Sequence, residues 1–219
     1  MKIRVSRAKI QVTVFESLIK GPWKPQEALK LLSQLSQCLS RAAISHWITY
    51  GSLLGLVRQN SLLARDNDID IAVAPGVSLQ AIRAALATDN LYPQMIKEID
   101  KQLILVRVCV GGIRADIYVL TEQHGLLLDF EGKDGFVLTM SHPKSAVIEK
   151  MFGNTTLPVP TQTEDYLAHL YGPNWRISTS NWSWKHSSAN RTTLDINSFQ
   201  GLLKYTKSWL LWRWNGRLT

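Results

Sequence analysis

Helical spacing of apolar residues is clearest in Pro25–Ser40, where leucines recur every three or four positions after a proline suited to a first helical turn. We predict an amphipathic helix there. Leu79–Ala87 is predicted as a second helix from its alanine and leucine content. Thr163–Tyr171 is predicted as a third, because acidic residues lie in its first turn and Gly172-Pro173 follows it.

Strands are predicted where β-branched and aromatic residues dominate. Ile44–Tyr50 ends at Gly51-Ser52, and the LLGLVRQ that follows predicts a short helix. Asp68–Ala74 alternates carboxylates with isoleucines before becoming wholly apolar, which is typical of a strand that runs from a wet edge into a core. Further strands are predicted at Met95–Ile99, Leu103–Val110 and Ile113–Leu120, with Gly111-Gly112 as a hairpin turn.

This order of elements predicts an α/β (α+β) fold, a mixed sheet flanked by helices with a C-terminal helical extension. At 219 residues the chain fits a single domain, whose core we expect at about residues 26–176. Residues 121–160, punctuated by glycine and proline, predict shorter strands and loops. Residues 178–198 are dense in Ser, Thr and Asn and are predicted to form a long loop, a candidate acceptor lid.

The last segment, residues 199–219, mixes tryptophans and basic residues in one helical pattern. One interpretation is a helix packed on the core with a solvated basic face, and the other is peripheral contact with an acidic lipid surface. The residues concerned are Trp209, Trp212, Trp214, Lys204, Lys207, Arg213 and Arg217.

Composition is that of a globular protein, with 45% hydrophobic and 19% charged residues, which argues against disorder and against a membrane protein. The net charge of +8 favours anionic partners such as nucleotides, phosphorylated glycans or acidic lipids. Nucleic acid is not an expected partner. Cys38 and Cys109 are expected to be buried free thiols in a reducing compartment. The first residues lack the apolar stretch of a signal peptide, so we expect a cytoplasmic protein.

Asp68 and Asp70 are the first candidates for chemistry. The two-residue period of a strand places both carboxylates on one face and the neighbouring isoleucines on the other. Carboxylates that converge in this way repel each other unless a cation lies between them, and hard oxygen ligands suit Mg²⁺ or Mn²⁺. The alternative is a solvated acidic strand end without a ligand. An EF-hand is excluded, because Ile71 and Val77 occupy its sixth and twelfth positions counted from Asp66.

Asp116 lies alone in another apolar strand, where an unpaired charge is costly to bury. If this strand lies beside that of Asp68, the three carboxylates form a cup for two divalent ions, or for one ion and a general base. Upstream, Gly51 and Ser52 occupy a strand-to-helix turn that suits a phosphate, and Arg58 lies on the same helix. A plain turn with a surface arginine is the alternative there.

The order strand, Gly-Ser, helix, Asp-x-Asp strand and later Asp strand resembles the DNA polymerase β type nucleotidyltransferase superfamily. One of its branches, the LicD family of fukutin and fukutin-related protein, has a Gly-Thr/Ser-Leu-Leu-Gly-x-x-Arg run followed by Pro-Trp-Asp-Asp-Asp-Ile-Asp. The similar segment here is GSLLGLVRQNSLLARDNDIDIAV. Two later segments also resemble family blocks, RADIYVL and MFGNTTLPVPTQTEDYLAHLYGPNW. The resemblance covers about residues 30–176.

The resemblance implies transfer of a substituted phosphate, such as phosphocholine or a polyol phosphate, from a CDP-activated donor to a glycan hydroxyl. It also implies roles for residues at matching positions. Asp68 and Asp70 become metal ligands, Asp116 becomes a ligand or base, and the donor phosphates contact Gly51, Ser52 and Arg58.

Pocket candidates by the same resemblance are Tyr171, Gly172 and Trp175, for which a helix-ending glycine with core aromatics is the alternative. The sequence departs from the family before the acidic run, where Ala64-Arg65 replaces Pro-Trp and Asn67 replaces the middle aspartate. Arg65 adds positive charge beside the carboxylates, and Arg65 and Asp66 are further pocket candidates. Two other functions stay open: transfer of a nucleoside monophosphate to a hydroxyl, and a catalytically silent glycan- or membrane-binding module.

Overall fold

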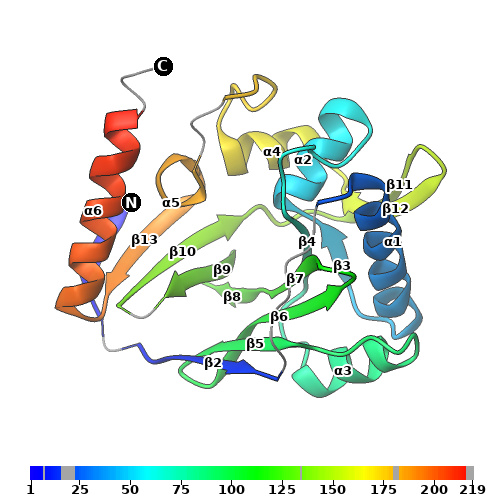
Figure 1. The fold of residues 1–219 in the computed structure, drawn as a ribbon, viewed down its shortest axis with the longest axis horizontal. Helices are drawn as coiled ribbons and strands as arrows, with labels where there is room; N and C mark the ends of the chain where they lie inside the picture. Colours follow the sequence, from blue (N-terminus) through cyan, green and yellow to red (C-terminus); the bar gives the residue numbers. More distant parts are fainter. Residues whose placement is uncertain (7, 16–22, 134, 180–182, 216–219) are drawn as a thin grey trace.

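A computed structural model describes the chain except for residues 7, 16–22, 134, 180–182 and 216–219 (Figure 1). The helices are α1 (Pro25–Arg41), α2 (Tyr50–Gln59), α3 (Leu79–Ala87), α4 (Thr163–Tyr171), α5 (Trp184–Ser187) and α6 (Phe199–Asn215). The strands are β1 (Lys2–Val5), β2 (Ile10–Val14), β3 (His46–Ile48), β4 (Asp68–Val73), β5 (Met95–Ile99), β6 (Gln102–Val110), β7 (Ile113–Val119), β8 (Thr121–Gln123), β9 (Leu126–Lys133), β10 (Phe136–His142), β11 (Val147–Phe152), β12 (Thr155–Pro160) and β13 (Arg191–Ile196).

The predicted mixed sheet is present, with strand order β2-β5-β6-β7-β4-β3. Its one parallel pair among the described strands is β4 with β7, and the other neighbours are antiparallel. The polypeptide needs α3, β5 and β6 to return from β4 to β7 in the same direction. The α+β class with flanking helices is therefore confirmed.

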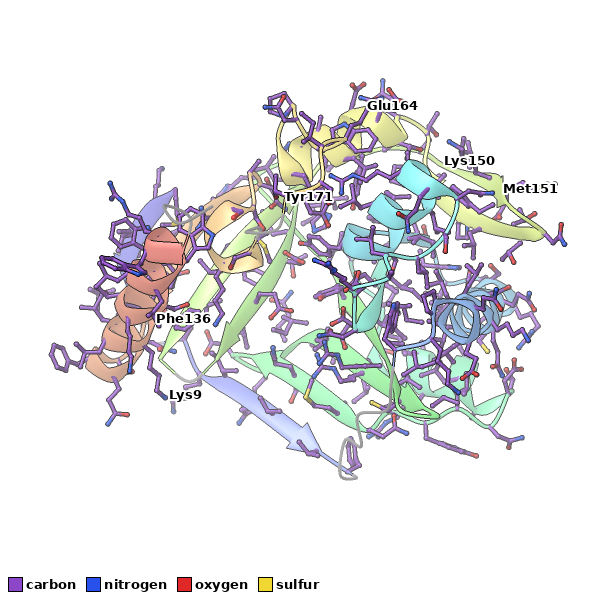
Figure 2. All side chains as sticks on the ribbon, turned by 45° about the horizontal axis from the view of Figure 1, so that its top comes forward. Lys9, Phe136, Lys150, Met151, Glu164 and Tyr171 are labelled. Atoms are coloured by element: carbon purple, nitrogen blue, oxygen red, sulfur yellow. The ribbon has the colours of Figure 1, made fainter. Side chains whose placement is uncertain are left out.

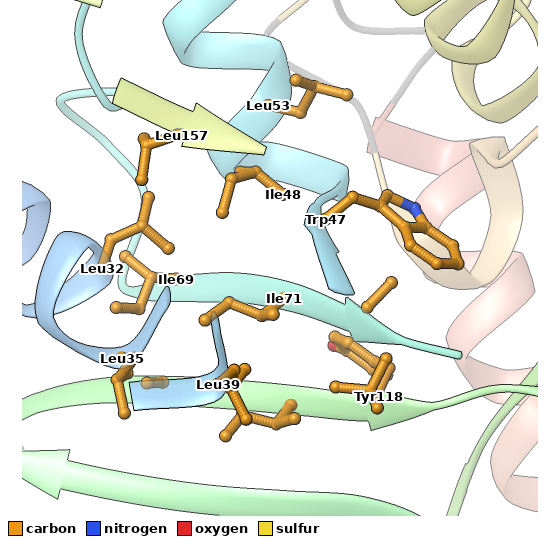
Figure 3. Close-up of a cluster of buried hydrophobic side chains, with 14 of the residues drawn as sticks. Leu32, Leu35, Leu39, Trp47, Ile48, Leu53, Ile69, Ile71, Tyr118 and Leu157 are labelled. Atoms are coloured by element: carbon orange, nitrogen blue, oxygen red, sulfur yellow. The ribbon is translucent and has the colours of Figure 1, made fainter. Parts of the chain in front are cut away.

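One face of this sheet is closed by α1. Figure 3 shows leucines of α1 beside Ile69 and Ile71 of β4, and both isoleucines are fully buried. Because side chains alternate along a strand, Asp68 and Asp70 must lie on the opposite face. The leucine stripe of α1 thus determines which way the acidic residues point.

A second sheet, which the sequence did not predict, has the order β1-β13-β10-β9-β8. It corrects the prediction of a loop over residues 178–198, since α5 and β13 lie within that range. Leu194 and Ile196 of β13 form a separate apolar cluster with Phe136, Leu138 and Tyr205. The core therefore extends beyond the expected limit of residue 176.

Candidate active site

Asp70 and Asp116 are direct neighbours across the parallel β4–β7 pair. Asp68 is paired in the same register with Arg114, one side-chain pair nearer the start of both strands. Asp70 and Asp116 are buried, with 6% and 2% of their surface exposed. The condition for a shared carboxylate site, that the two acidic strands lie side by side, is therefore met.

Arginines hold two of these carboxylates. Arg107 of β6 lies opposite Asp116 and donates from Nε to Oδ1 at 2.5 Å and from the guanidinium to Oδ2 at 2.6 Å. Arg114 donates to Asp68 and, at 2.8 Å, to the Asn67 side-chain oxygen. A bidentate pair of this kind is strong and directional, so Asp116 is fixed in orientation.

The start of α2 is tied to Asp70. Ser52 Oγ accepts a hydrogen bond from the Asp70 backbone N–H at 2.8 Å, and the Ser52 N–H points to Asp70 Oδ2 at 3.4 Å. Ser52, predicted to contact a phosphate, is buried and hydrogen-bonded to Asp70. The positive end of α2 also favours the negative charge there.

Gly51 lies directly under the acidic cluster. A Cβ at this position would be 2.4 Å from Asp66 Oδ2 and 3.5 Å from Asp70 Oδ2. The absence of a side chain therefore allows the two carboxylates to approach the turn. The Gly-Ser turn accommodates the side chains of Asp66 and Asp70, and any phosphate bound at the turn would lie beside them.

Burial and repulsion by neighbouring carboxylates raise the pKa values of Asp66 and Asp70. The Asp66 pKa rises to about 7, first through burial and then through the charge of Asp68. Burial also raises the pKa of Asp70 well above its usual range, and Asp68, Asp66 and Asp116 add to the effect. Proximity to several like charges in a buried place makes this a region of strongly negative potential.

The donor set fits a hard divalent cation in charge and chemistry. Four carboxylates face the guanidinium groups of Arg107 and Arg114, so two negative charges are uncompensated when all four are ionised. Over the described residues, however, no three acidic, His or Cys side chains converge as a ready metal-ligand group. Among the described residues, Asp66 and Asp70 are the members of the cluster that form no ion pair with an arginine. Asp66 was predicted only as a pocket residue.

Among the remaining predicted residues, Tyr171 and Arg58 lie near the acidic cluster. Tyr171, at the end of α4 (Figure 2), is partly buried and lies close enough to Asp70, Asp66 and Arg58 to interact with their charges. Desolvation raises its pKa well above its usual range, and both aspartates add to the effect. Arg58 donates to the Ile177 carbonyl oxygen at 3.3 Å. Tyr171 and Arg58 thus belong to the neighbourhood of the acidic cluster.

Gly172, Trp175 and Arg65 are the other pocket candidates. Gly172 ends α4 with a φ of 90°, a conformation that favours glycine. Trp175 is buried in the main core and carries the Arg176 guanidinium on its ring at 4.3 Å. Arg65 is exposed. Gly172 and Trp175 therefore match the alternative interpretation, in which the glycine ends a helix and the aromatic residue lies in the core.

Sequence reasoning missed a buried polar network beside the turn. Tyr50 donates to Asp129 Oδ2 at 2.6 Å, and its hydroxyl lies 3.1 Å from His142 Nε2; His142 Nδ1 lies 2.6 Å from the Tyr166 hydroxyl. Asp129 Oδ1 is buried without a hydrogen-bond partner among the described residues. The network holds Tyr50, whose φ of 43° is unusual for an aromatic residue, directly before Gly51.

Arg107 was also missed, although the sequence contained a signal for it. It is a lone charge inside an apolar strand, LVRVCV, and a buried charge requires a partner. The argument that singled out Asp116 applies equally to Arg107. Each residue is the other's partner.

Comparison with known proteins gives one family match and distant relatives. Residues 43–162 match the family described as "LicD/FKTN/FKRP, nucleotidyltransferase domain". The mouse protein named "Ribitol-5-phosphate transferase FKTN" is 22% identical over 196 residues, and the human protein of that name is 21% identical. Each alignment covers 86% of this chain and 42% of the relative, so the chain spans less than half of the length of these proteins.

Solved structures of the antibiotic-resistance factor ANT(2'')-Ia are similar at a lower level. A solution structure aligns with a TM-score of 0.46 at 12% identity, covering 73% of this chain and 78% of the other. A crystal structure described as a complex with adenylyl-2''-tobramycin aligns with a TM-score of 0.42 at 13% identity, covering 72% and 82%.

Proposed function

Because this chain belongs to the LicD family, we propose that it is a transferase that moves a substituted phosphate from a nucleotide-activated donor to a hydroxyl group, as on a glycan. The named activity of its relatives, ribitol-5-phosphate transfer, supports a polyol phosphate as the group moved, and we propose a CDP-linked molecule as its donor. The observation that carries the proposal is the pairing of Asp70 with Asp116 on adjacent parallel strands, beside the start of α2.

In this proposal Asp68 and Asp70 hold Mg²⁺ or Mn²⁺, with Asp66 and Asp116 completing the negative site. A bound divalent ion neutralises charge on the donor phosphates. Asp116, held in place by Arg107, is proposed to accept the proton of the acceptor hydroxyl. The hydroxyl oxygen bonds to phosphorus, the phosphoanhydride bond to the nucleoside monophosphate breaks, and that nucleotide leaves.

The main contribution of the chain's own residues is to hold the reacting groups in position. Ser52 and Gly51 fix Asp70 at the end of α2, and Arg58 and Tyr171 provide polar groups nearby. Holding donor and acceptor in line lowers the barrier by converting a bimolecular step into an intramolecular one. From the order of these motifs we also propose that the chain belongs to the wider superfamily of DNA polymerase β type enzymes.

A direct assay tests the proposal. The purified chain is incubated with Mg²⁺ and CDP-ribitol, CDP-glycerol or CDP-choline plus a glycan acceptor, and release of CMP is measured. We expect metal-dependent CMP release that is lost in Asp70→Asn and kept in Glu149→Gln, which removes a carboxylate from an exposed position on β11. Equal turnover by Asp70→Asn and the parent chain would sink the site assignment.

Nucleotidyl transfer is the second candidate, favoured by the domain description of the matched family. The same carboxylates then act while the nucleoside monophosphate is attached to the acceptor. The two reactions differ in their products, because substituted-phosphate transfer releases CMP and nucleotidyl transfer retains it on the acceptor. Mass spectrometry of the acceptor distinguishes them.

A further inference from the structure

Helix α6 shows an apolar face to the outside. Phe199, Leu203, Leu210 and Trp214 are spaced by four, seven and four residues, which places them on one side of a helix. All four are exposed, Phe199 to 74% and Trp214 to 68%. Packing within the fold therefore leaves this stripe uncovered.

The opposite face of α6 attaches it to the second sheet. Tyr205 is buried and stacks edge-on against Phe136 at 5.6 Å between ring centres. Gly201 lies so close to Gly135 that a Cβ on either would overlap the other's backbone. The helix is thus fixed by one narrow side, and Figures 1 and 2 show it at the outer end of the molecule with Phe136 beside it.

Strand β1 extends the same exposed surface. Ile3 and Val5 are in register with Leu194 and Ile196 of β13, whose side chains lie on the sheet face that α6 covers. Residues paired in register point to the same side. Ile3 is 69% exposed and Val5 93%, so the apolar surface continues past the helix onto the sheet edge.

Positive charge surrounds this surface. Helix α6 contains Lys204, Lys207 and Arg213 and has no Asp or Glu in its sequence. A cavity of about 430 Å³ at the start of the helix is lined by Lys9 and Lys204, by Ala8 and Ile10, and by several polar residues. An apolar stripe bordered by cations is the pattern of helices that lie in the headgroup region of acidic membranes.

We propose that α6 and β1 dock this protein on the surface of an anionic lipid membrane, with the apolar stripe in the interface and the basic residues at the headgroups. Among the helices that the structure describes, none has the length and hydropathy for crossing a bilayer, so the contact is peripheral. A second copy of this chain fits the surface less well, because a twofold contact would bring α6 cations against their own counterparts.

Vesicle sedimentation tests the proposal independently of the transferase reaction, since it needs neither donor nor metal. We expect the parent chain to bind vesicles of phosphatidylcholine with about one-third phosphatidylserine, and to bind pure phosphatidylcholine at least about tenfold more weakly. Leu203→Glu combined with Leu210→Glu should weaken binding about tenfold or more, and Lys204→Glu with Lys207→Glu should do the same. Raised salt should weaken the parent's binding.

Met151→Glu is the matched control, because Met151 is 71% exposed on the β11–β12 hairpin, away from α6 (Figure 2). It should bind vesicles like the parent. Circular dichroism and thermal melting show that each variant is folded. Failure of the parent to bind acidic vesicles, or equal binding by the Leu203/Leu210 variant, overturns the proposal. Concentration-dependent dimerisation lost in that variant, without vesicle binding, identifies a second copy as the occupant instead.

Discussion

The Arg107–Asp116 pair allows a sharp test of how the acidic sheet face is held together. The side chains are 17% and 3% exposed and share two hydrogen bonds near 2.5 Å. Replacing Arg107 with Met leaves a buried anion that also faces Asp70, its neighbour on β4. Loss of one partner of a buried pair costs about 3–5 kcal/mol. For a chain of this length that corresponds to a fall in Tm of roughly 10 °C.

A double-mutant cycle turns this reasoning into a measurement. Asp116→Asn alone should cost about 2 kcal/mol, because an amide accepts a weaker bond from the guanidinium. The double variant should be more stable than Arg107→Met alone, since its buried anion is gone. Urea unfolding followed by tryptophan fluorescence gives the four stabilities. We expect a coupling energy of at least about 2 kcal/mol, and additivity within about 0.5 kcal/mol would refute the argument.

Three further perturbations probe the site and the fold. Asp70→Asn should raise stability by about 1 kcal/mol in EDTA, because it removes a buried charge that its neighbours repel. The variant should also lose the stabilisation that Mg²⁺ gives the parent chain. A melting series with and without Mg²⁺ checks both results, and a variant that is less stable than the parent in EDTA contradicts the repulsion. Gly51→Ala should cut turnover about a hundredfold with little change in far-UV dichroism, because its Cβ would displace Asp66; near-parental turnover contradicts this. Burial lowers the His46 pKa, so the folded state favours neutral imidazole. The contribution of His46 to stability is full above pH 6.5 and falls by up to about 1.4 kcal/mol per unit as pH drops below it, until the folded pKa is reached. Urea titrations at pH 5 to 8 should show this slope in the difference between the parent chain and His46→Gln, because the opposite contribution of Asp66 is common to both; a difference that does not change with pH contradicts the prediction.

Helices and strands with a strong local pattern of apolar residues were predicted closely from the sequence. The helix expected at Pro25–Ser40 extends to Arg41, and the strand expected at Asp68–Ala74 ends at Val73. Both segments have strong periodicity and clear boundaries. The face of β4 on which Asp68 and Asp70 lie followed for the same reason, since the alternation of Asp and Ile determines which face each side chain takes. The pairing of this strand with that of Asp116 was only a condition of the site.

The second sheet could not be found in this way. Strand β13 lies in a segment rich in Ser, Thr and Asn, and it becomes a strand because β1 and β10 pair with it from distant parts of the chain. Long-range pairing leaves little trace in local composition. The polar network was missed for a related reason, because Asp129 and His142 acquire their partners only when β9 and β10 are brought against α2.

The parallel pairing of β1 with β13 also constrains the order in which this protein acquires its structure. Residues 2–5 are made early but find their neighbours only when residues 193–196 have emerged, some 190 positions later. Closing so long a segment carries a large entropic penalty, and such contacts form late. Until then β1 is unpaired, and in the finished sheet it is still the edge strand. Its alternating Lys2 and Arg4 are the kind of residues that discourage pairing with other chains. During synthesis, the second sheet is therefore finished last.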